Sequence, residues 1–371
     1  MSSSNPIKLL PRACVCGEKE DLRRCSGCRV VYYCEHKHRL IDHIFHWSAC
    51  YKAKEARRIL EKERKALWDM VDDGSVPNDL FQDGIGYFGA VPLTEPYILA
   101  KYQLANTLLL SFGGPGGRVD AVQAALDCFL RMFQLNRGDR KDVRLVIPAL
   151  FIRLNKDQEA YDFIKWCAST GDPAYFEWDD WGQYGWDNDL DFLEVKDADA
   201  FEESKNWVSE HRSDTSPMLA LTLIKVRILL DLLATLNTTR AFQGSVPKEI
   251  IEFICEQLMG GIVQSRPEII RGRVEDMARH VETIKAQITG LYKLMNGYNP
   301  HVWRLMLSDP YAAAASGPFS YPFTSEETAC MAIEESMASW LETPRSLDMM
   351  RSVSQTASTT HEKRGCYQCG T

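Results

Sequence analysis

The sequence lacks an apolar run long enough to cross a membrane. Its most apolar stretch, 218–236, contains Lys225, Arg227 and Asp231, whereas a spanning helix needs about 20 predominantly apolar residues. The N-terminal residues also lack the apolar core of a signal peptide. We therefore expect an intracellular protein, in the cytoplasm or the nucleus, whose cysteines are reduced.

An excess of positive charge is also missing. The 371 residues include 43 Lys and Arg against 51 Asp and Glu, a formal net charge of −8. This balance disfavours nucleic acid as a partner for the bulk of the chain. Basic residues do gather at 51–65, which holds seven Lys or Arg and three Glu. We expect a basic helix there, opening a segment 51–95 that continues as an irregular linker rich in Pro and Gly.

Sequence motifs of common enzymes are absent as well. The chain contains no G-x-S-x-G, no P-loop and no H-E-x-x-H. The serine-hydrolase, nucleotide-binding and zinc-protease arrangements that these motifs mark are therefore disfavoured. We expect a protein that is not an enzyme.

What the chain does have is a dense group of metal-binding residue types near its N-terminus. Six of its twelve cysteines and two of its eight histidines fall in the pattern C-x-C-x8-C-x2-C-x5-C-x3-H-x7-H-x3-C. The eight candidate ligands are Cys14, Cys16, Cys25, Cys28, Cys34, His38, His46 and Cys50. Eight such ligands make two tetrahedral zinc sites without an open position for substrate. The group therefore predicts a binding module rather than a metalloenzyme.

The local spacing also suits zinc. Cys25 and Cys28 form a C-x2-C pair, and Gly27 between them allows a tight turn around a metal. Two later pairs are spaced i, i+4, so the members of each can share one helix face. These pairs are Cys34 with His38, and His46 with Cys50.

The stretch 13–50 resembles the MYND zinc finger. The shared features are Cys16-Gly17, Leu22, Cys25-Ser26-x-Cys28, Tyr33-Cys34, His38, Asp42, His46 and Cys50. The resemblance implies an interleaved cross-brace over residues 12–50, preceded by an arm, 1–11. One zinc would be held by Cys14, Cys16, Cys34 and His38, and the other by Cys25, Cys28, His46 and Cys50.

The sequence departs from the MYND pattern in three respects. The first pair is C-x-C, one residue shorter than the usual C-x2-C, so we expect a strained bite at that zinc. Arg39 and His43 stand where peptide-binding members carry Gln and Trp, two side chains that help line their proline-rich peptide site. The resemblance therefore implies an intact metal scaffold with an altered peptide surface.

Other side chains lie between the ligands. His36 and His43 are expected to be solvated helix residues, because the set of eight ligands is complete without them. Phe45 and Trp47 are expected to pack on the small core of the finger. The alternative is that Trp47 contacts a partner.

Residues 96–341 show helical periodicity almost throughout, so we predict a mostly α fold in which the two-zinc finger precedes an α-helical array. Helices are expected at 97–112, 119–135, 142–155 and 157–169. An alignment of the second and fourth helices at an offset of 35 residues suggests tetratricopeptide-like repeats as the more specific alternative. The body also resembles a group of fungal proteins with a MYND finger before a helical region, which supports the architecture rather than a mechanism.

An acidic, aromatic segment interrupts this pattern at 172–203. Twelve carboxylates there face a single Lys196, and Trp178, Trp181 and Trp186 are interleaved with them. We expect an acidic surface loop whose rings pack on the helices, with protein binding as the main rival. Binding of a hard cation or acid–base catalysis is less favoured, because no EF-hand spacing is present.

The segment 267–295 carries a heptad-like seam whose apolar residues are three or four apart. They are Ile270, Val274, Met277, Val281, Ile284, Ile288, Leu291 and Met295. We expect burial of this seam against neighbouring helices of the same chain, and a homodimer through 267–295 is the alternative. The Ser- and Thr-rich tail at 342–371 predicts disorder, and its closing pair, Cys366 and Cys369, is expected to be incidental.

Together these features predict a zinc-binding protein–protein interaction or scaffold protein with two Zn²⁺ per chain, whose finger docks a partner protein. The alternative is a nucleic-acid-associated transcriptional regulator that uses the finger and the basic helix. A SET-type methyltransferase is disfavoured, because the body is helical and its only Asn-x-His is Asn299-Pro-His301. We expect removal of zinc to unfold the finger while the helical body keeps its far-UV signal.

Overall fold

A computed structural model of the chain describes residues 7–365 with internal gaps. The gaps are 73–79, 84, 87, 140, 170–194, 205–207, 209–214, 243–246 and 315–323. Most of the acidic aromatic segment and the pair Cys366 and Cys369 therefore lie outside the described residues. The described part is mostly helical, and its strands are limited to one short pair, which confirms the predicted mostly α class.

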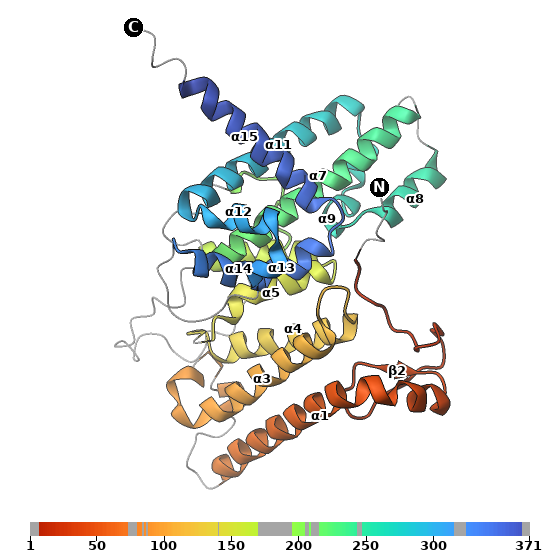
Figure 1. Cartoon of the computed structure of the whole chain (residues 1–371), viewed down its shortest axis with the longest axis vertical. Coiled ribbons are helices and arrows are strands. Elements are labelled where there is room, and N and C mark those ends of the chain that lie inside the picture. Colours follow the sequence, from red (N-terminus) through yellow and green to blue (C-terminus); the bar gives the residue numbers. More distant parts are fainter. Residues whose placement is uncertain are drawn as a thin grey trace. The chain divides into compact units, whose positions relative to one another are not determined.

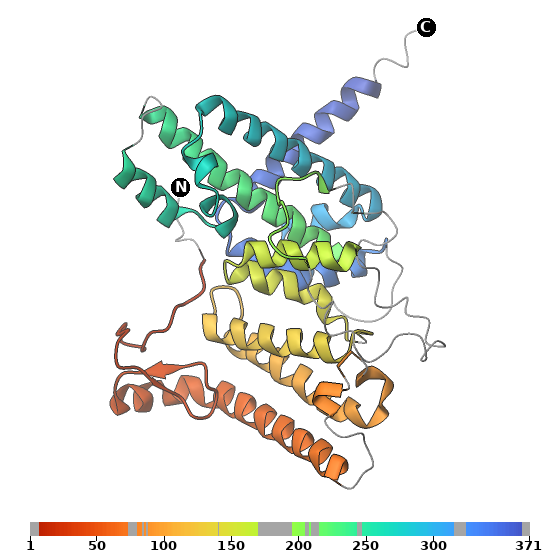
Figure 2. The same cartoon turned by 180° about the vertical axis from the view of Figure 1, so that it is seen from behind.

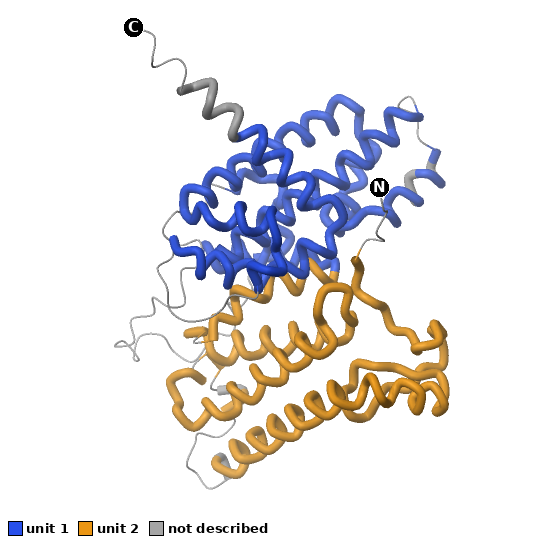
Figure 3. The backbone as a smooth tube through the Cα atoms, in the orientation of Figure 1, with its two compact units in different colours: residues 1–6, 155–170, 195–371 blue, residues 7–154, 171–194 orange. Residues whose placement is uncertain are grey.

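The chain divides into two compact units (Figure 3). The described residues 7–154 belong to one, here called the finger unit, and 155–169 with 195–365 belong to the other, here called the second unit. The boundary falls between the third and fourth of the helices expected from the sequence. The expected helical domain 96–341 is thus shared between the two units, and residues 12–50 do not form a unit of their own. A tetratricopeptide-like arrangement stays a prediction.

The finger unit begins with two short strands and a long helix. Its elements are β1 (Arg23–Arg24), β2 (Tyr32–Tyr33), α1 (His36–Asp72), α2 (Leu80–Asp83), η1 (Phe88–Ala90), η2 (Pro92–Thr94), α3 (Glu95–Phe112), α4 (Val119–Leu135) and α5 (Val143–Arg153). The strands are antiparallel, with Arg23 opposite Tyr33. One helix, α1, runs from the finger through the whole basic segment, so the expected boundary at residue 50 lies inside it.

The helices of the finger unit lie side by side. α1 packs on α3, α3 on α4, and α4 on α5, and Figures 1 and 2 show this order from both sides. The turn between α3 and α4 is rich in glycine because it is tight. A Cβ on Gly117 would lie 2.4 Å from the carbonyl oxygen of Phe112, and Gly116 has a φ of +70°. This turn brings α4 back along α3.

The finger and the helical hairpin α3–α4 share one apolar core. Val30 and Val31 of the finger belong to the same buried cluster as Leu104 and Leu108 of α3 and Ala121 of α4. The finger is therefore packed on the hairpin through buried side chains, and this burial stabilises both parts together.

Helices are the only regular elements among the described residues of the second unit. Its elements are α6 (Asp157–Ser169), α7 (Thr215–Ala241), α8 (Lys248–Gln257), α9 (Gly261–Gln264), α10 (Pro267–Ile270), α11 (Val274–Tyr298), α12 (His301–Ser308), α13 (Pro310–Ala314), α14 (Glu326–Leu341) and α15 (Ser346–Gly365). None of the helices described in either unit is long and apolar enough to span a membrane.

The apolar helix α7 is the centre of the second unit. It is buried around most of its circumference, and the three charged residues that interrupt it are satisfied internally. Arg227 Nε lies 2.7 Å from Asp157 Oδ2, Lys225 donates to two backbone carbonyls, and Asp231 accepts from two backbone N–H groups. Paired in this way, the charges are compatible with a protein core.

The seam at 267–295 is divided by a break. Residues 271–273 separate α10 from α11, so the seam does not run along one continuous helix. From Met277 to Met295 its apolar side chains are buried, and α11 packs on α7. The seam is therefore used within the chain, as expected. A homodimer through this segment stays a prediction, and it would have to use the other, charged face of α11.

The C-terminal segment differs from the sequence-based expectation. Helix α15 covers Ser346–Gly365, whereas the composition of 342–371 predicts disorder. Met350 is fully buried, and the Ser346 hydroxyl donates to the carbonyl of Trp340 at 2.8 Å. The prediction of disorder was based on the Ser and Thr content of the segment, which contains no information on these contacts.

Candidate metal centres

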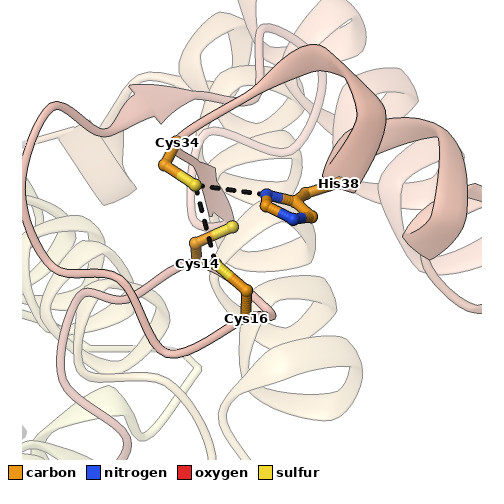
Figure 4. A group of neighbouring side chains, drawn as sticks. All are labelled: Cys14, Cys16, Cys34 and His38. Atoms are coloured by element: carbon orange, nitrogen blue, oxygen red, sulfur yellow. Dashed lines mark hydrogen bonds between the residues drawn. The ribbon is translucent and has the colours of Figure 1, made fainter.

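Four of the eight predicted ligands meet at one point and form what we call site 1. Cys14 and Cys16 come from the loop before β1, Cys34 directly follows β2, and His38 lies in the first turn of α1 (Figure 4). Cys34 Sγ is 3.6 Å from Cys16 Sγ and 3.1 Å from His38 Nδ1. All four ligand atoms lie within 4.8 Å of one another.

The other four ligands form site 2. Cys25 follows β1, Cys28 lies in the turn towards β2, and His46 and Cys50 are one turn apart on α1. Cys25 Sγ is 3.6 Å from Cys50 Sγ, and Cys28 Sγ is 3.2 Å from His46 Nε2. These atoms too lie within 4.8 Å of one another. The structure thus groups the eight residues in the two interleaved sets that the resemblance to MYND fingers implied.

Both sets fit a tetrahedral zinc ion. A Zn–S bond of about 2.3 Å places two ligand sulfurs about 3.8 Å apart, close to the 3.6 Å found in each site. Three thiolates and one imidazole per site are the donors that zinc prefers. Each set of four is complete, so zinc held there would be structural. The shortened pair Cys14 and Cys16 still brings both sulfurs into site 1.

The protonation of the thiols in site 2 also suits a cation. A hydrogen bond from Cys28 lowers the pKa of Cys25 to about 2, while that pairing and burial raise the pKa of Cys28. Burial, followed by the contact with Cys25, raises the pKa of Cys50. Thiolates this close repel one another, so a divalent cation bound there would replace the thiol protons and offset that repulsion.

Gly27 is required at site 2 for a reason that the sequence did not reveal. We expected it to allow a tight turn, but its φ is not in the left-handed region. A Cβ built on Gly27 would instead lie 2.6 Å from Cys50 Sγ. Glycine leaves the room in which the Cys50 sulfur reaches the site. The left-handed positions of the finger are Gly17, Asp21 and Arg29; Gly17 follows Cys16, and Arg29 follows Cys28.

A hydrogen-bonded relay orients the imidazole of site 2. Tyr33 Oη lies 2.6 Å from Asp42 Oδ2 and 2.8 Å from His46 Nδ1. Burial and then the bond to Asp42 raise the pKa of Tyr33, so the phenol keeps its single proton. It donates that proton to Asp42 and accepts from the Nδ1–H of His46. The Nε2 lone pair of His46 is thereby left to face the sulfurs of site 2.

The relay contains residues that support site 2 without being ligands, and the spacing of ligands in the sequence does not identify such residues. Tyr33 and Asp42 match the MYND pattern, but their joint role becomes visible only from the hydrogen bonds. Arg57 carries no sequence signal at all, yet its guanidinium donates to the carbonyl of Cys28 at 2.8 Å. That bond ties the turn of site 2 to a later part of α1.

The two histidines that lie between the ligands of the finger, His36 and His43, are exposed, as expected. His36 and His43 lie on the outer side of α1 and belong to neither cluster. Arg39 and His43 line a shallow hollow of ≈ 240 Å³ beside Trp47 and Tyr51. This is the region in which the altered peptide surface was expected.

The prediction for Phe45 and Trp47 was wrong. Their side chains are 84% and 58% exposed, respectively, instead of packing on the finger core. The inward face of α1 is occupied by His46, Cys50 and Ala53, and the apolar partners of the finger come from α3 and α4. The finger therefore has no place left inside for these two rings.

The described carboxylates of the acidic segment do not form a metal site. Asp199 pairs with Arg266 at 2.9 Å, and Glu202 accepts from Lys165 at 2.6 Å and from Tyr161 at 2.8 Å. Within the described parts of the chain, sites 1 and 2 are the only groups of three or more Cys, His, Asp or Glu ligands that could share an ion.

Comparisons of the chain with protein-family models, with curated proteins and with solved structures find no match. The interpretation of the two sites therefore depends on the spacing and the geometry of their residues.

Proposed function

We propose that the chain is a zinc-dependent protein-interaction or scaffold protein, and that residues 12–50 are a MYND-type finger holding two structural zinc ions. The observation that carries this proposal is the arrangement of the eight ligands in two closed sets, first pair with third and second pair with fourth. This interleaving is the cross-brace order that the resemblance to MYND fingers implies.

Zinc at these sites would cross-link two segments that have little regular structure of their own to the helix α1. Site 1 joins the N-terminal loop to the start of α1, and site 2 joins the turn after β1 to a later part of α1, at His46 and Cys50. Since three thiolates and an imidazole complete each ion, its chemistry would be to hold the fold. The relay from Asp42 through Tyr33 would fix the ligand His46 in place.

A docking role is supported by the surface that the sites build. The first four turns of α1 contain the ligands His38, His46 and Cys50. On their outer side they expose large apolar side chains to solvent, among them Ile44, Phe45 and Trp47. Exposed apolar groups gathered on a rigid support are typical of protein–protein contacts. The finger would therefore dock a partner protein, and the helical units would carry further contact surface.

Affinity purification of the tagged full-length chain tests this proposal. The variant Cys28→Ser removes a ligand of site 2, and Cys255→Ser replaces a cysteine outside both sites as the control. We expect partners recovered with the wild type and with Cys255→Ser to be lost with Cys28→Ser. Recovery of the same partners at the same yield with Cys28→Ser would overturn the proposal.

A second candidate function is a nucleic-acid-associated regulator. One observation favours it, namely that α1 continues without a break from the finger into the basic segment and exposes Arg58, Lys62 and Lys65. Binding of the full-length chain to duplex DNA or to RNA would then weaken steeply with salt, because phosphate contacts release counterions. An absence of binding at low salt would remove this candidate.

A further inference from the structure

The outermost line of α1 is divided along its length. Along one face of this helix, exposed residues follow one another at intervals of three or four and point away from the rest of the finger unit. They are Leu40, Ile44, Trp47, Tyr51, Lys54, Arg58, Lys62 and Lys65. The first four are apolar or aromatic and the last four are cationic. We call this line the split ridge, with an apolar half and a basic half. All eight side chains are exposed.

The apolar half consists of four exposed side chains, two of which stack on each other. Ile44 is 83% exposed, and Leu40, Trp47 and Tyr51 are each more than half exposed. The rings of Trp47 and Tyr51 stack with centroids 6.0 Å apart, at an interplanar angle of 23°. Aromatic anchors such as Trp47 and Tyr51 are the kind of residue that often carries a large share of the binding energy of protein interfaces. Held on one helix, they lose little conformational freedom when a partner binds.

The ridge has no role in the fold of the finger unit. Ala53 and Leu67 on the opposite face of α1 are buried, and the helix packs on α3 through that face. Residues of the ridge lie one half-turn away and contribute nothing to the shared core of finger and hairpin. A core requirement therefore does not explain why Ile44 and Trp47 are apolar.

Among the described residues, the basic half is neutralised only in part. Arg58 pairs with Glu55, and Lys62 lies 3.4 Å from Glu63, both along the same helix. Among the described residues, no carboxylate pairs with Lys54 or Lys65. Cations next to an apolar surface complement a partner that carries both apolar side chains and carboxylates.

We propose that the split ridge binds an acidic amphipathic segment of a partner protein, with apolar side chains over the apolar half and carboxylates over the basic half. The inference rests on the proposed interaction function and specifies the partner. From Leu40 to Lys65 the ridge is about 38 Å long at the helical rise of 1.5 Å per residue. A partner helix of about 25 residues laid along it would match this length.

The arrangement favours a polypeptide over a membrane surface or a nucleic acid. A helix that lies on a membrane divides its apolar and basic residues around its circumference, so that one face is apolar along the whole length. Here Leu40 to Tyr51 and Lys54 to Lys65 share one face and follow each other along the axis. Phosphate backbones would use the basic half but leave aliphatic side chains such as Leu40 and Ile44 without partners.

Selection of random 25-residue peptides displayed on phage, against the zinc-loaded full-length chain, tests the inference without assuming a partner. Two double variants remove the halves of the ridge: Leu40→Ser with Ile44→Ser, and Lys54→Glu with Lys65→Glu. Leu110→Ser and Lys293→Glu are matched controls, because both side chains are exposed on other helices. Circular dichroism and zinc content show that each variant keeps its fold.

We expect the enriched peptides to combine a cluster of Leu, Ile or Phe with a cluster of Asp or Glu. Synthetic copies should bind each double variant about tenfold more weakly than the wild type, and the controls as tightly as the wild type. Peptides without acidic residues, equal affinity for the double variants, or a lack of enrichment would overturn the inference. So would ridge-dependent sedimentation with vesicles of phosphatidylcholine and phosphatidylserine.

A further variant separates this inference from the proposed function. If the enriched peptides bind the ridge variants normally but are lost with Cys28→Ser, the finger docks partners elsewhere and the ridge inference alone fails. If they bind Cys28→Ser and the ridge variants equally well, both proposals fail.

Discussion

The imidazole of His46 lies edge-on to the ring of Phe112, with the ring centroids 6.1 Å apart. His46 is a candidate ligand of site 2, and Phe112 is the last residue of α3. A second tie is the carboxylate of Asp120 on α4, which accepts from Arg12 at 2.8 Å and from Tyr32 at 3.2 Å. The finger that carries the metal sites is therefore in direct contact with both helices of the hairpin, α3 and α4.

Zinc removal is expected to loosen more than the finger. The sequence alone suggested that a chelator would leave the helical body intact, but Val30 and Val31 share a core with Leu104 and Leu108. Limited proteolysis read by mass spectrometry should therefore show new cleavage within α3 and α4 after chelation, while α7 and α11 of the second unit stay protected. Cleavage confined to residues 12–50 would contradict this expectation.

The contact between His46 and Phe112 provides a matched pair of variants for the same prediction. Phe112 is half-buried against the finger core, so Phe112→Ala should destabilise the finger unit by about 2 kcal/mol and speed zinc release to a competing chelator. Leu110→Ala on the same helix is the control, because Leu110 is 87% exposed. Equal release rates for the two variants would show that the contact does not couple the hairpin to the site.

Loss of the Tyr33 hydroxyl is expected to weaken zinc binding at site 2. Tyr33→Phe leaves Asp42 without its donor and the Nδ1–H of His46 without its acceptor. Replacing such an outer partner of a metal-bound histidine typically lowers metal affinity about 10- to 100-fold. Competition with a chromogenic chelator measures this. Tyr32→Phe is the control, since the Tyr32 hydroxyl contacts Asp120 and not a ligand, and equal affinities of the two variants would refute the relay.

Gly27→Ala should empty site 2 and spare site 1. The added methyl would lie 2.6 Å from Cys50 Sγ, so that sulfur has to leave its place or the turn has to shift, at a cost of about 1–3 kcal/mol. We expect the zinc content to fall towards one ion per chain. Gly114→Ala is a suitable control, because nothing lies within 4 Å of a Cβ there. Two tightly held zinc ions in Gly27→Ala would contradict the close packing of site 2.

The second unit should gain stability as the pH falls towards 5. Burial raises the pKa of Asp231 to about 6, against the opposing effect of the N–H groups of Met259 and Gly260. A raised folded-state pKa stabilises the protein fully below the ordinary Asp value near 4, and this contribution is lost as the pH rises through about 6. The full effect is about 3 kcal/mol at most. Above about pH 7 no further loss from this group is expected.

Urea unfolding of the second unit at pH 7.5 and at pH 5.5 measures this dependence. The wild type should be more stable at pH 5.5 relative to Asp231→Asn, in which the titrating carboxyl is missing. Burial likewise raises the pKa of Asp157 in the same unit, so only the difference between wild type and variant isolates Asp231. An identical pH dependence in both would show that Asp231 titrates normally.

Short-range sequence patterns predicted the parts of the molecule that short-range physics determines. The helices expected at 97–112 and 119–135 correspond to α3 and α4 almost residue for residue. The eight ligands were identifiable because zinc requires pairs of donors close in sequence, and the structure brings them together in two sets.

Features set by contacts between distant segments were missed. Phe45 and Trp47 were expected inside because they are large and apolar, but the inner face of α1 is filled by α3. The tail was expected to be disordered, yet Met350 packs into the second unit. Likewise, the need for Gly27 follows from Cys50, which approaches it only in the folded finger. In each case, the deciding neighbour lies too far along the chain for local patterns to register.

The most direct test of the two metal centres is the zinc content of the purified full-length chain, measured by mass spectrometry of the metal together with that of two single variants. We predict two zinc ions in the wild type, one in Cys16→Ser, which keeps site 2, and one in Cys28→Ser, which keeps site 1. A wild-type chain without zinc, or variants that keep both ions, would contradict the existence of two separate four-ligand sites.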